Sequence, residues 1–547
     1  MQIRSDILRI YQKVHLWTGI TTGILLFICF FAGALTMFKT EIAAWASPPS
    51  HVLPQVPVER LDELLAKAQA QHPEISQGFT IYPNDSRYSP LTWSQVSRDH
   101  DVHLNAAQWQ ASLTPEGELI TQQVVPNQLA ELIDQLHRTA GIAGHVGHEQ
   151  LGVLVMGVAS MLYFIALVSG VIFLLPTLVK TLFALRRKKG PSRFWLDTHN
   201  LLGITALPFH IVIALTVIVF AFHDQFYDAL NQTIYKTPPS FMPRTAMQAP
   251  AEHPPLPVIS EVLTAANRFQ ADYQARSITF AGLDGPRAMA RIEMYSDSAM
   301  MRGPMADFLA LNPYNHQVLF STMTAGEQGI WGRIVAVFFG LHFGSFAGMA
   351  GRWLYFGLGL SGAMLFYSGN LLWLEKRRKL QKQATTPVQQ PKRVRIMAAL
   401  TVGCCLGSVV AIAASMVLGK WLAPVLDNVN YSYLWIYYLG FAAALGYSFS
   451  AGAARAAIRL LQAGALLCLA IPLSSLVALC LPSLGLWAPQ TPATLMVDVV
   501  ALLSAAGFAY AAKLTYRRAV NGDADSIWAL TPPTTPTRVN RQLSQSS

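Results

Sequence analysis

Eight long apolar segments limit what this chain can fold into more than any other feature of the sequence. A helix needs about 20 apolar residues to cross a bilayer. Only 13% of the 547 residues are charged, roughly half the usual share in a soluble protein. We therefore predict a polytopic α-helical membrane protein with about eight transmembrane helices. The apolar segments are roughly 14–38, 150–176, 198–222, 347–373, 396–419, 432–449, 456–480 and 494–512.

Basic residues gather on one side of the predicted membrane. Lys and Arg precede the first apolar segment, lie between the second and third, the fourth and fifth, and the sixth and seventh, and follow the eighth. Because Lys and Arg are biased toward the cytoplasm, this pattern predicts that both termini are cytoplasmic and that two long segments, about 39–149 and 223–346, face outside. The net charge of +10 therefore reflects topology and does not indicate nucleic-acid binding.

Each of the two long outer segments is predicted to form a small α+β module. Apolar residues at helical spacing predict a helix at 58–71 in the first module and at 258–269 in the second. Strand-like pieces and turns follow each helix. These pieces are 79–82, 113–119, 291–295 and 318–320, the last preceded by a turn at 311–315.

The order of histidines, apolar segments and outer modules occurs twice along the chain. His15 and His199 lie at the cytoplasmic start of an apolar segment, and His137 and His342 precede the outer start of another. A parallel duplication of this kind relates two halves by an axis normal to the membrane. The predicted units are a first repeat at 1–195, a second repeat at 196–375, a four-helix bundle at 396–512 and a disordered cytoplasmic tail at 520–547.

The repeat predicts that the four histidines meet in two pairs. His15 would face His199 on the cytoplasmic side, and His137 would face His342 on the outer side. Two facing imidazoles are the axial ligands of a six-coordinate b-type haem, so we predict two haems b with these residues as iron ligands. Interfacial anchoring and a cation or proton relay are the alternatives. Glycines expected to make room for porphyrin faces are Gly19, Gly203, Gly141, Gly144, Gly344 and Gly348.

Two further polar residues interrupt apolar segments. His210 lies deep in the third segment, just after Pro208, and could be an alternative haem ligand, a proton carrier or a buried structural residue. Arg352 in the fourth segment could bind a haem propionate through two hydrogen bonds, hold another anion, or extend to the outer surface. Both are candidate cofactor-binding residues, and the sequence assigns no catalytic residue.

Four short motifs resemble a known family. They are H-x-W-x-G from His15, L-H-R at 136–138, D-x-H-N-x-x-G at 197–203 and L-H-F-G…G-R-W at 341–353. Over about 1–375 the chain resembles the PepSY-associated transmembrane helix family, and its outer modules are similar to PepSY domains. The resemblance implies relatives that include dihaem siderophore reductases of the bacterial inner membrane, and it supports haem ligation by the same four histidines. The four C-terminal apolar segments depart from the family's four-span core.

These patterns predict an oxidoreductase, namely a haem-containing electron conduit that reduces ferric siderophores or other ferric chelates in the periplasm. Because no G-x-G-x-x-G follows a predicted strand, electrons would come from the membrane quinol pool or a cytoplasmic donor. The alternative is a PepSY-type regulatory or ligand-binding membrane protein without redox activity. A transporter ranks third, because polar residues in the last four apolar segments are few.

Overall fold

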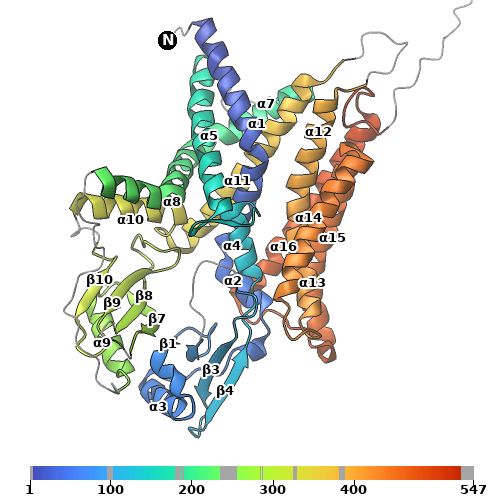
Figure 1. The fold of residues 1–547 in the computed structure, drawn as a ribbon. Helices are drawn as coiled ribbons and strands as arrows, with labels where there is room; N and C mark the ends of the chain where they lie inside the picture. The colour runs from blue at the N-terminus through green and yellow to red at the C-terminus, as the bar shows by residue number, and fades with distance from the viewer. Residues whose placement is uncertain are drawn as a thin grey trace, which may run out of the picture.

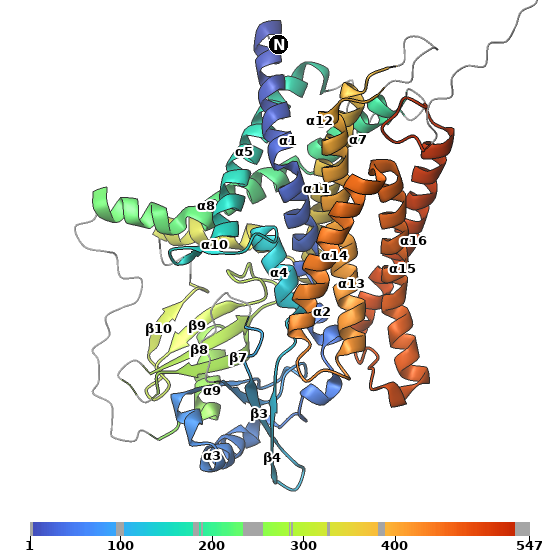
Figure 2. The ribbon, with the colours of Figure 1, turned by 45° about the vertical axis from the view of Figure 1, so that its right-hand side comes forward.

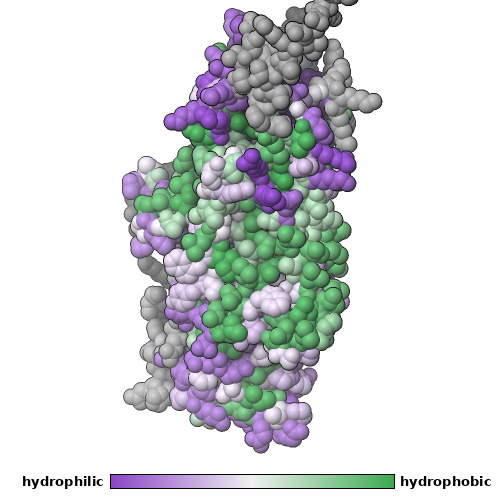
Figure 3. Space-filling view, turned by 90° about the vertical axis from the view of Figure 1, so that its right-hand side faces the viewer, coloured by the Kyte–Doolittle hydropathy of each residue, from purple (hydrophilic) through white to green (hydrophobic). Residues whose placement is uncertain are grey.

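The computed structural model describes residues 4–94, 103–178, 185–186, 190–233, 255–283, 285, 288–324, 329–380 and 389–530. Long helices make up most of it, and an eight-stranded sheet stands at one end of the helices (Figure 1). A broad apolar band crosses one face of the helical part, with hydrophilic residues beyond both of its ends (Figure 3). Leu479 and Leu503, which are 70% and 68% exposed, are typical of side chains that face lipid.

Six helical stretches in the described residues are long and apolar enough to cross a membrane. A possible seventh crossing is a pair of helices, α10 (Gly329–Phe343) and α11 (Gly348–Arg377), that meet at 67°. The six are formed by α1 (Ser5–Thr36), α5 (Leu151–Leu174), α8 (Leu207–Thr233), α12 (Lys392–Leu400) with α13 (Gly407–Leu422), α15 (Ala453–Cys480) and α16 (Pro492–Asn521).

All eight predicted segments are helical, but not all are simple spans. The third divides at Ala206 into α7 (Pro191–Thr205) and α8, because Pro208 is tolerated in the first turn of a helix but not inside one. The sixth corresponds to α14 (Asn430–Ala451), which is less apolar because it contains several tyrosines. The helical class is therefore confirmed, whereas eight crossings stay a prediction.

Helix α1 lies at the centre of the first 377 residues. It packs against α5, α11 and the short helix α4 (Leu129–Thr139), while α5 packs on α8 and α11 packs on α7. Helices α13 to α16 form a second bundle at one side, as Figures 1 and 2 both show, and they pack against α1, α4 and the short helix α2 (Lys39–Ala46). Helix α2 follows α1, contacts α16 and so connects the two helical groups.

The two outer segments join in one sheet, whereas the sequence predicted two separate modules. The strand order is β10-β9-β8-β7-β1-β2-β3-β4, and β1 pairs with β7 in antiparallel orientation at the junction. This pairing removes one exposed edge from each module. The strands are β1 (Gly78–Ile81), β2 (Leu91–Trp93), β3 (Gln108–Leu113), β4 (Leu119–Val124), β7 (Gln274–Ala281), β8 (Met289–Tyr295), β9 (Asp307–Leu311) and β10 (Val318–Ser321).

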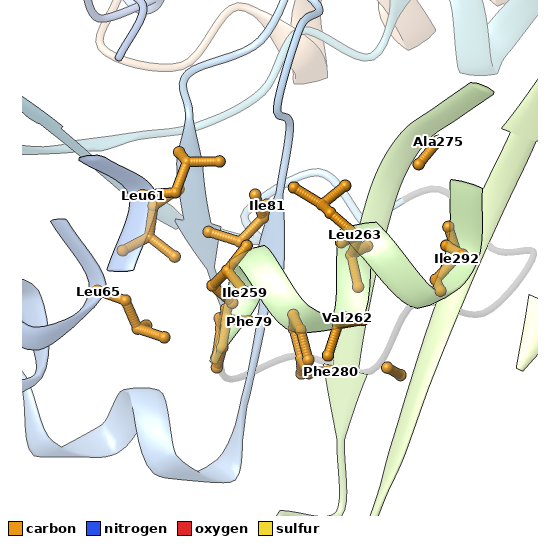
Figure 4. Packing of buried hydrophobic residues seen from close by; sticks show 14 of the residues in the cluster. Leu61, Leu65, Phe79, Ile81, Ile259, Val262, Leu263, Ala275, Phe280 and Ile292 are labelled. Atoms are coloured by element: carbon orange, nitrogen blue, oxygen red, sulfur yellow. The ribbon is translucent and has the colours of Figure 1, made fainter. Parts of the chain in front are cut away.

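Two helices supply the core of this sheet. The predicted helices are α3 (Leu61–Gln71) and α9 (Ile259–Phe269), and both turn their apolar residues toward the strands (Figure 4). Phe79 of β1 stacks on Phe280 of β7 with ring centroids 4.6 Å apart. The two modules therefore share one hydrophobic core as well as one sheet.

The start of the predicted disordered tail is folded. Helix α16 continues to Asn521, and the following residues turn back along it. The Trp528 side chain is buried, and its Nε1 donates a hydrogen bond to Glu375. The expectation of disorder from residue 520 is therefore wrong up to 530, because Trp528 finds an apolar contact; residues 531–547 lie outside the described part of the chain.

Candidate functional site

The structure brings together the two histidine pairs that the internal repeat predicted. The ring centroids of His15 and His199 lie 6.0 Å apart, with planes inclined at 65°. Those of His137 and His342 lie 6.3 Å apart, with planes inclined at 36°. We call these the sheet-distal pair and the sheet-proximal pair, because α4 and α10, which carry His137 and His342, follow strands of the sheet (Figure 1).

Each imidazole is oriented by a hydrogen bond at its Nδ1 atom. In three cases the partner is a backbone carbonyl, which can only accept, so Nδ1 carries the hydrogen and Nε2 keeps its lone pair. This arrangement fixes the ring and the tautomer of metal-binding histidines. The distances are 2.8 Å for His15 to Ala166 O, 3.1 Å for His199 to Leu365 O, 3.0 Å for His137 to Cys29 O and 2.9 Å for His342 to Thr216 Oγ1.

Three of the four rings also lie directly against a glycine. A Cβ added to Gly33 would lie 2.6 Å from His137 Nδ1, one added to Gly170 would lie 2.8 Å from His15 Nδ1, and one added to Gly369 would lie 3.2 Å from His199 Cε1. Each of these glycines follows the carbonyl acceptor of its ring by four residues, one helical turn along. The absence of a side chain therefore lets the imidazole reach the helix backbone.

The glycines that contact the rings differ from those predicted from the sequence. A Cβ at Gly19 would meet nothing within 4 Å, and one at Gly203 would meet only Leu365 at 3.5 Å. Gly141, Gly144, Gly344 and Gly348 have positive φ angles, so they serve the turns that follow α4 and α10. Sequence proximity to a histidine was a poor guide, because the glycines that contact the rings lie on neighbouring helices.

The spacing of each pair fits an iron atom between the rings. Metal–imidazole nitrogen bonds of about 2 Å on both sides separate the two ring centroids by about 6 Å, close to both observed values. Two protein ligands leave four positions of a six-coordinate iron for porphyrin nitrogens. Among the described residues there is no group of three His, Cys, Asp or Glu that could hold a bare ion. The donor set therefore suits haem better than a free metal.

The two pairs lie at different depths in the helical part. His15 is on α1, and the carbonyl that accepts from His137 belongs to Cys29 on the same helix. At 1.5 Å per residue, the interval between positions 15 and 29 is about 21 Å. This separation is a large fraction of the hydrocarbon thickness of about 30 Å.

His210 occupies a third, separate environment. It is fully buried on α8, and neither ring nitrogen has a hydrogen-bond partner in the described part of the chain. Its ring packs among Phe30, Tyr163 and Phe209, with centroid distances of 6.0, 6.1 and 5.5 Å. The structure thus places His210 among aromatic rings rather than in a histidine pair, and its role as an alternative ligand stays a prediction.

The structure gives Arg352 a protein partner instead of a free approach to a cofactor. Its Nη1 and Nη2 donate to the two carboxylate oxygens of Glu41 at 2.9 and 2.6 Å, and its Nε and Nη2 donate to the Met37 carbonyl at 2.9 and 2.6 Å. The guanidinium also lies over the Phe38 ring, and the side chain is only 10% exposed. Arg352 therefore connects α11 to the junction of α1 and α2 and does not extend to the surface. Its role in binding a cofactor stays a prediction.

The C-terminal bundle contains a buried polar network that the sequence did not predict. Lys420 on α13 is 1% exposed; its Nζ lies 4.2 Å from the Trp45 ring centre and donates to Ser475 Oγ at 3.2 Å. Trp45 in turn donates from Nε1 to Asp498 at 2.9 Å. In the sequence, Lys420 stands at the end of an apolar segment, where a lysine is equally typical of a residue that extends to the membrane surface. The sequence therefore did not indicate that it is buried.

A comparison with protein families agrees with this arrangement. The model of the PepSY-associated TM region matches residues 12–376. The match covers well over half of the chain, includes both histidine pairs and the whole sheet, and ends before α12. No curated protein matches the chain. From residue 12 to residue 376, the chain belongs to the family of PepSY-associated transmembrane proteins.

Proposed function

We propose that this protein is a dihaem electron conduit that reduces ferric siderophores or other ferric chelates. The observation that supports it best is the presence of two imidazole pairs, each spaced for one iron atom, at two depths of the helical part. A haem held by two imidazoles would have no open position for a ligand and would therefore serve electron transfer.

The residues of this chain have defined tasks in that proposal. His15 with His199, and His137 with His342, would each hold one haem b, which would supply one-electron transfer. The backbone carbonyls keep Nδ1 of His15, His137 and His199 protonated and Nε2 free for iron. The Thr216 hydroxyl donates to the Val212 carbonyl at 2.8 Å and therefore accepts from His342 Nδ1. We assign the ferric chelate to the side of the molecule that carries the sheet, because the sheet-proximal histidine pair is the closer of the two pairs to that side. Reduction of hard, oxygen-bound ferric iron weakens its hold on the chelate.

The proposal places the protein in a bacterial inner membrane, with the sheet in the periplasm and the basic connecting segments in the cytoplasm. Every strand in the described residues belongs to the sheet or to a short hairpin, β5 (His145–Val146) and β6 (Glu149–Gln150). None of these strands is followed by G-x-G-x-x-G, so the donor is a quinol or a separate cytoplasmic protein.

Visible spectroscopy of the purified protein tests the proposal. We expect sharp reduced bands after dithionite, two haems per chain, and reoxidation of the reduced bands when a ferric chelate is added. His15→Ala and His137→Ala should each lose about one haem, whereas His210→Ala, the control, should keep both. A protein that is colourless even after haem-supplemented expression would contradict the proposal.

A regulatory or ligand-binding role without redox activity is the second candidate. The sheet with α3 and α9 has a hydrophobic core of its own, separate from the helical clusters, so it could recognise a ligand or partner independently of haem. Haem content separates the two candidates, because only the first requires it.

A further inference from the structure

An apolar cavity lies between the family core and the C-terminal bundle. Its walls come from α1, α2 and α11 on one side and from α13, α15 and α16 on the other. The empty space within the cavity and its open mouth is about 900 Å³. Trp353 and Met496 line it and are 37% and 40% exposed, so the cavity opens on the apolar surface of the helical part.

One end of the cavity carries a buried carboxylate. Glu41 is 8% exposed, and it is the only charged residue among the described residues that line the space. Aromatic rings stand next to it: Phe38 lies 4.5 Å from Trp353 and 5.7 Å from Phe356, centroid to centroid. Arg352 and Thr40 already donate three hydrogen bonds to this carboxylate, which has about four lone-pair positions. A ligand that fits this arrangement therefore has a long apolar part, a flat ring and a hydroxyl group that can donate to the remaining position.

The cavity lies one helix away from the sheet-proximal histidine pair. Phe31 and Leu35 of α1 line the cavity, whereas Cys29 and Gly33 of the same helix contact the His137 ring. Residues two positions apart point to nearly opposite faces of a helix, because a turn takes 3.6 residues. The cavity and the imidazole are therefore separated by about one helix diameter, roughly 10 Å.

We propose that this cavity binds an isoprenoid quinol from the membrane and that Glu41 accepts its protons. The inference rests on the proposed function, since it names the donor for the two haems. Oxidation of the quinol to the quinone would break its two O–H bonds, and its two electrons would pass to the two ferric haems that the proposed function assigns to the histidine pairs, one electron to each. Glu41 takes up each proton in turn and releases it to the aqueous phase on the side of the sheet.

The geometry favours a quinol over the acyl chain of a phospholipid. An acyl chain fits the apolar walls but has no group to donate to the Glu41 lone pair that Arg352 and Thr40 leave open. The C-terminal bundle would take part in quinol binding, because α13, α15 and α16 form one side of the cavity wall.

Filling the cavity tests binding directly. Ser504 lines the cavity on α16, while the neighbouring Leu503 is 68% exposed outside it. We expect wild-type protein, purified in detergent and extracted with solvent, to release close to one quinone per chain, Ser504→Phe to release at least tenfold less, and the control Leu503→Phe to match the wild type. Recovery of phospholipid without quinone, or equal quinone from both variants, would overturn the inference.

Removing the base tests its role in oxidation. A general base usually contributes about 10²–10⁴-fold to a rate, so Glu41→Gln should slow haem reduction by decylubiquinol at least 100-fold, with dithionite reduction unchanged. Glu131→Gln, on the same side of the molecule but outside the cavity, should keep the wild-type rate. Wild-type kinetics in Glu41→Gln would overturn the role of Glu41. If this variant does not fold, the rate of haem reduction by decylubiquinol in Ser504→Phe still tests the quinol site, and a wild-type rate there would overturn it.

The two proposals fail in different ways. A protein without haem overturns the electron conduit, while its quinone content still reports on the cavity. A dihaem protein that ferric chelates reoxidise, but that contains no quinone and does not react with quinol, keeps the conduit and overturns the quinol site.

Discussion

The most specific test of the histidine geometry is the addition of one methyl group at Gly33. The new Cβ would lie 2.6 Å from Nδ1 and 2.7 Å from Cε1 of His137, whereas ordinary contacts begin at 3.4 Å. The imidazole must therefore retreat by about 0.8 Å. Its Nδ1 hydrogen bond to the Cys29 carbonyl, now 3.0 Å long, would stretch past the limit of about 3.2 Å for a good hydrogen bond.

We expect Gly33→Ala to weaken the binding of only one haem. Loss of the partner that orients a metal-binding histidine usually weakens metal affinity 10–100-fold, which corresponds to about 1.4–2.8 kcal/mol. Gly33→Ala should thus bind one haem as tightly as the wild type and the second 10–100-fold more weakly. The helix itself should not suffer, because alanine is a better helix former than glycine by about 1 kcal/mol.

Haem titration of the apoprotein, followed by the absorbance of bound haem, measures both affinities. Gly19→Ala is the matched control: it makes the same change on the same helix, but the added Cβ meets nothing within 4 Å. Equal affinities for the second haem in Gly33→Ala and Gly19→Ala would refute the claim that His137 is a ligand held by this contact.

Three further predictions concern single contacts. Thr216→Val removes the hydroxyl group that hydrogen-bonds to His342 Nδ1. We expect haem titration to show about tenfold weaker binding of one haem, and an unchanged affinity would contradict this prediction. Arg352→Met leaves the Glu41 carboxylate buried without its ion pair, so the free energy of unfolding should fall by about 3–5 kcal/mol, with partial recovery in the double variant with Glu41→Gln, as measured by denaturation in detergent. In the sheet, burial raises the pKa of Asp85, but hydrogen bonds and charge from Arg87 outweigh it and lower the pKa below its ordinary value. The stability that this lowered pKa provides is complete above the ordinary value of about 3.9 and is lost as the pH falls toward the native pKa; Asp85→Asn should therefore melt at a lower temperature at pH 7 and lose less stability than the wild type between pH 5 and 3.

The sequence alone determined the helical membrane class and the pairing of the histidines. A membrane-spanning helix is a local property, because about 20 apolar residues in a row leave the backbone no partner but itself. The pairing is not local, but the internal repeat carried it: His15 and His199 hold equivalent positions in two similar halves, as do His137 and His342. The hairpin that joins β3 to β4 and the helices α3 and α9 were likewise readable from short-range patterns.

Only the tertiary structure decided how distant segments meet. The pairing of β1 with β7 merges two modules into one sheet, and the contact between Arg352 and Glu41 joins residues 311 positions apart. The glycines that support the histidine rings, and the cavity between α1 and α16, depend on neighbouring helices in the same way. The physical reason is that hydropathy and helical periodicity specify which face of a segment is buried, whereas the partner that buries it is chosen by packing and hydrogen bonding between elements far apart in the chain.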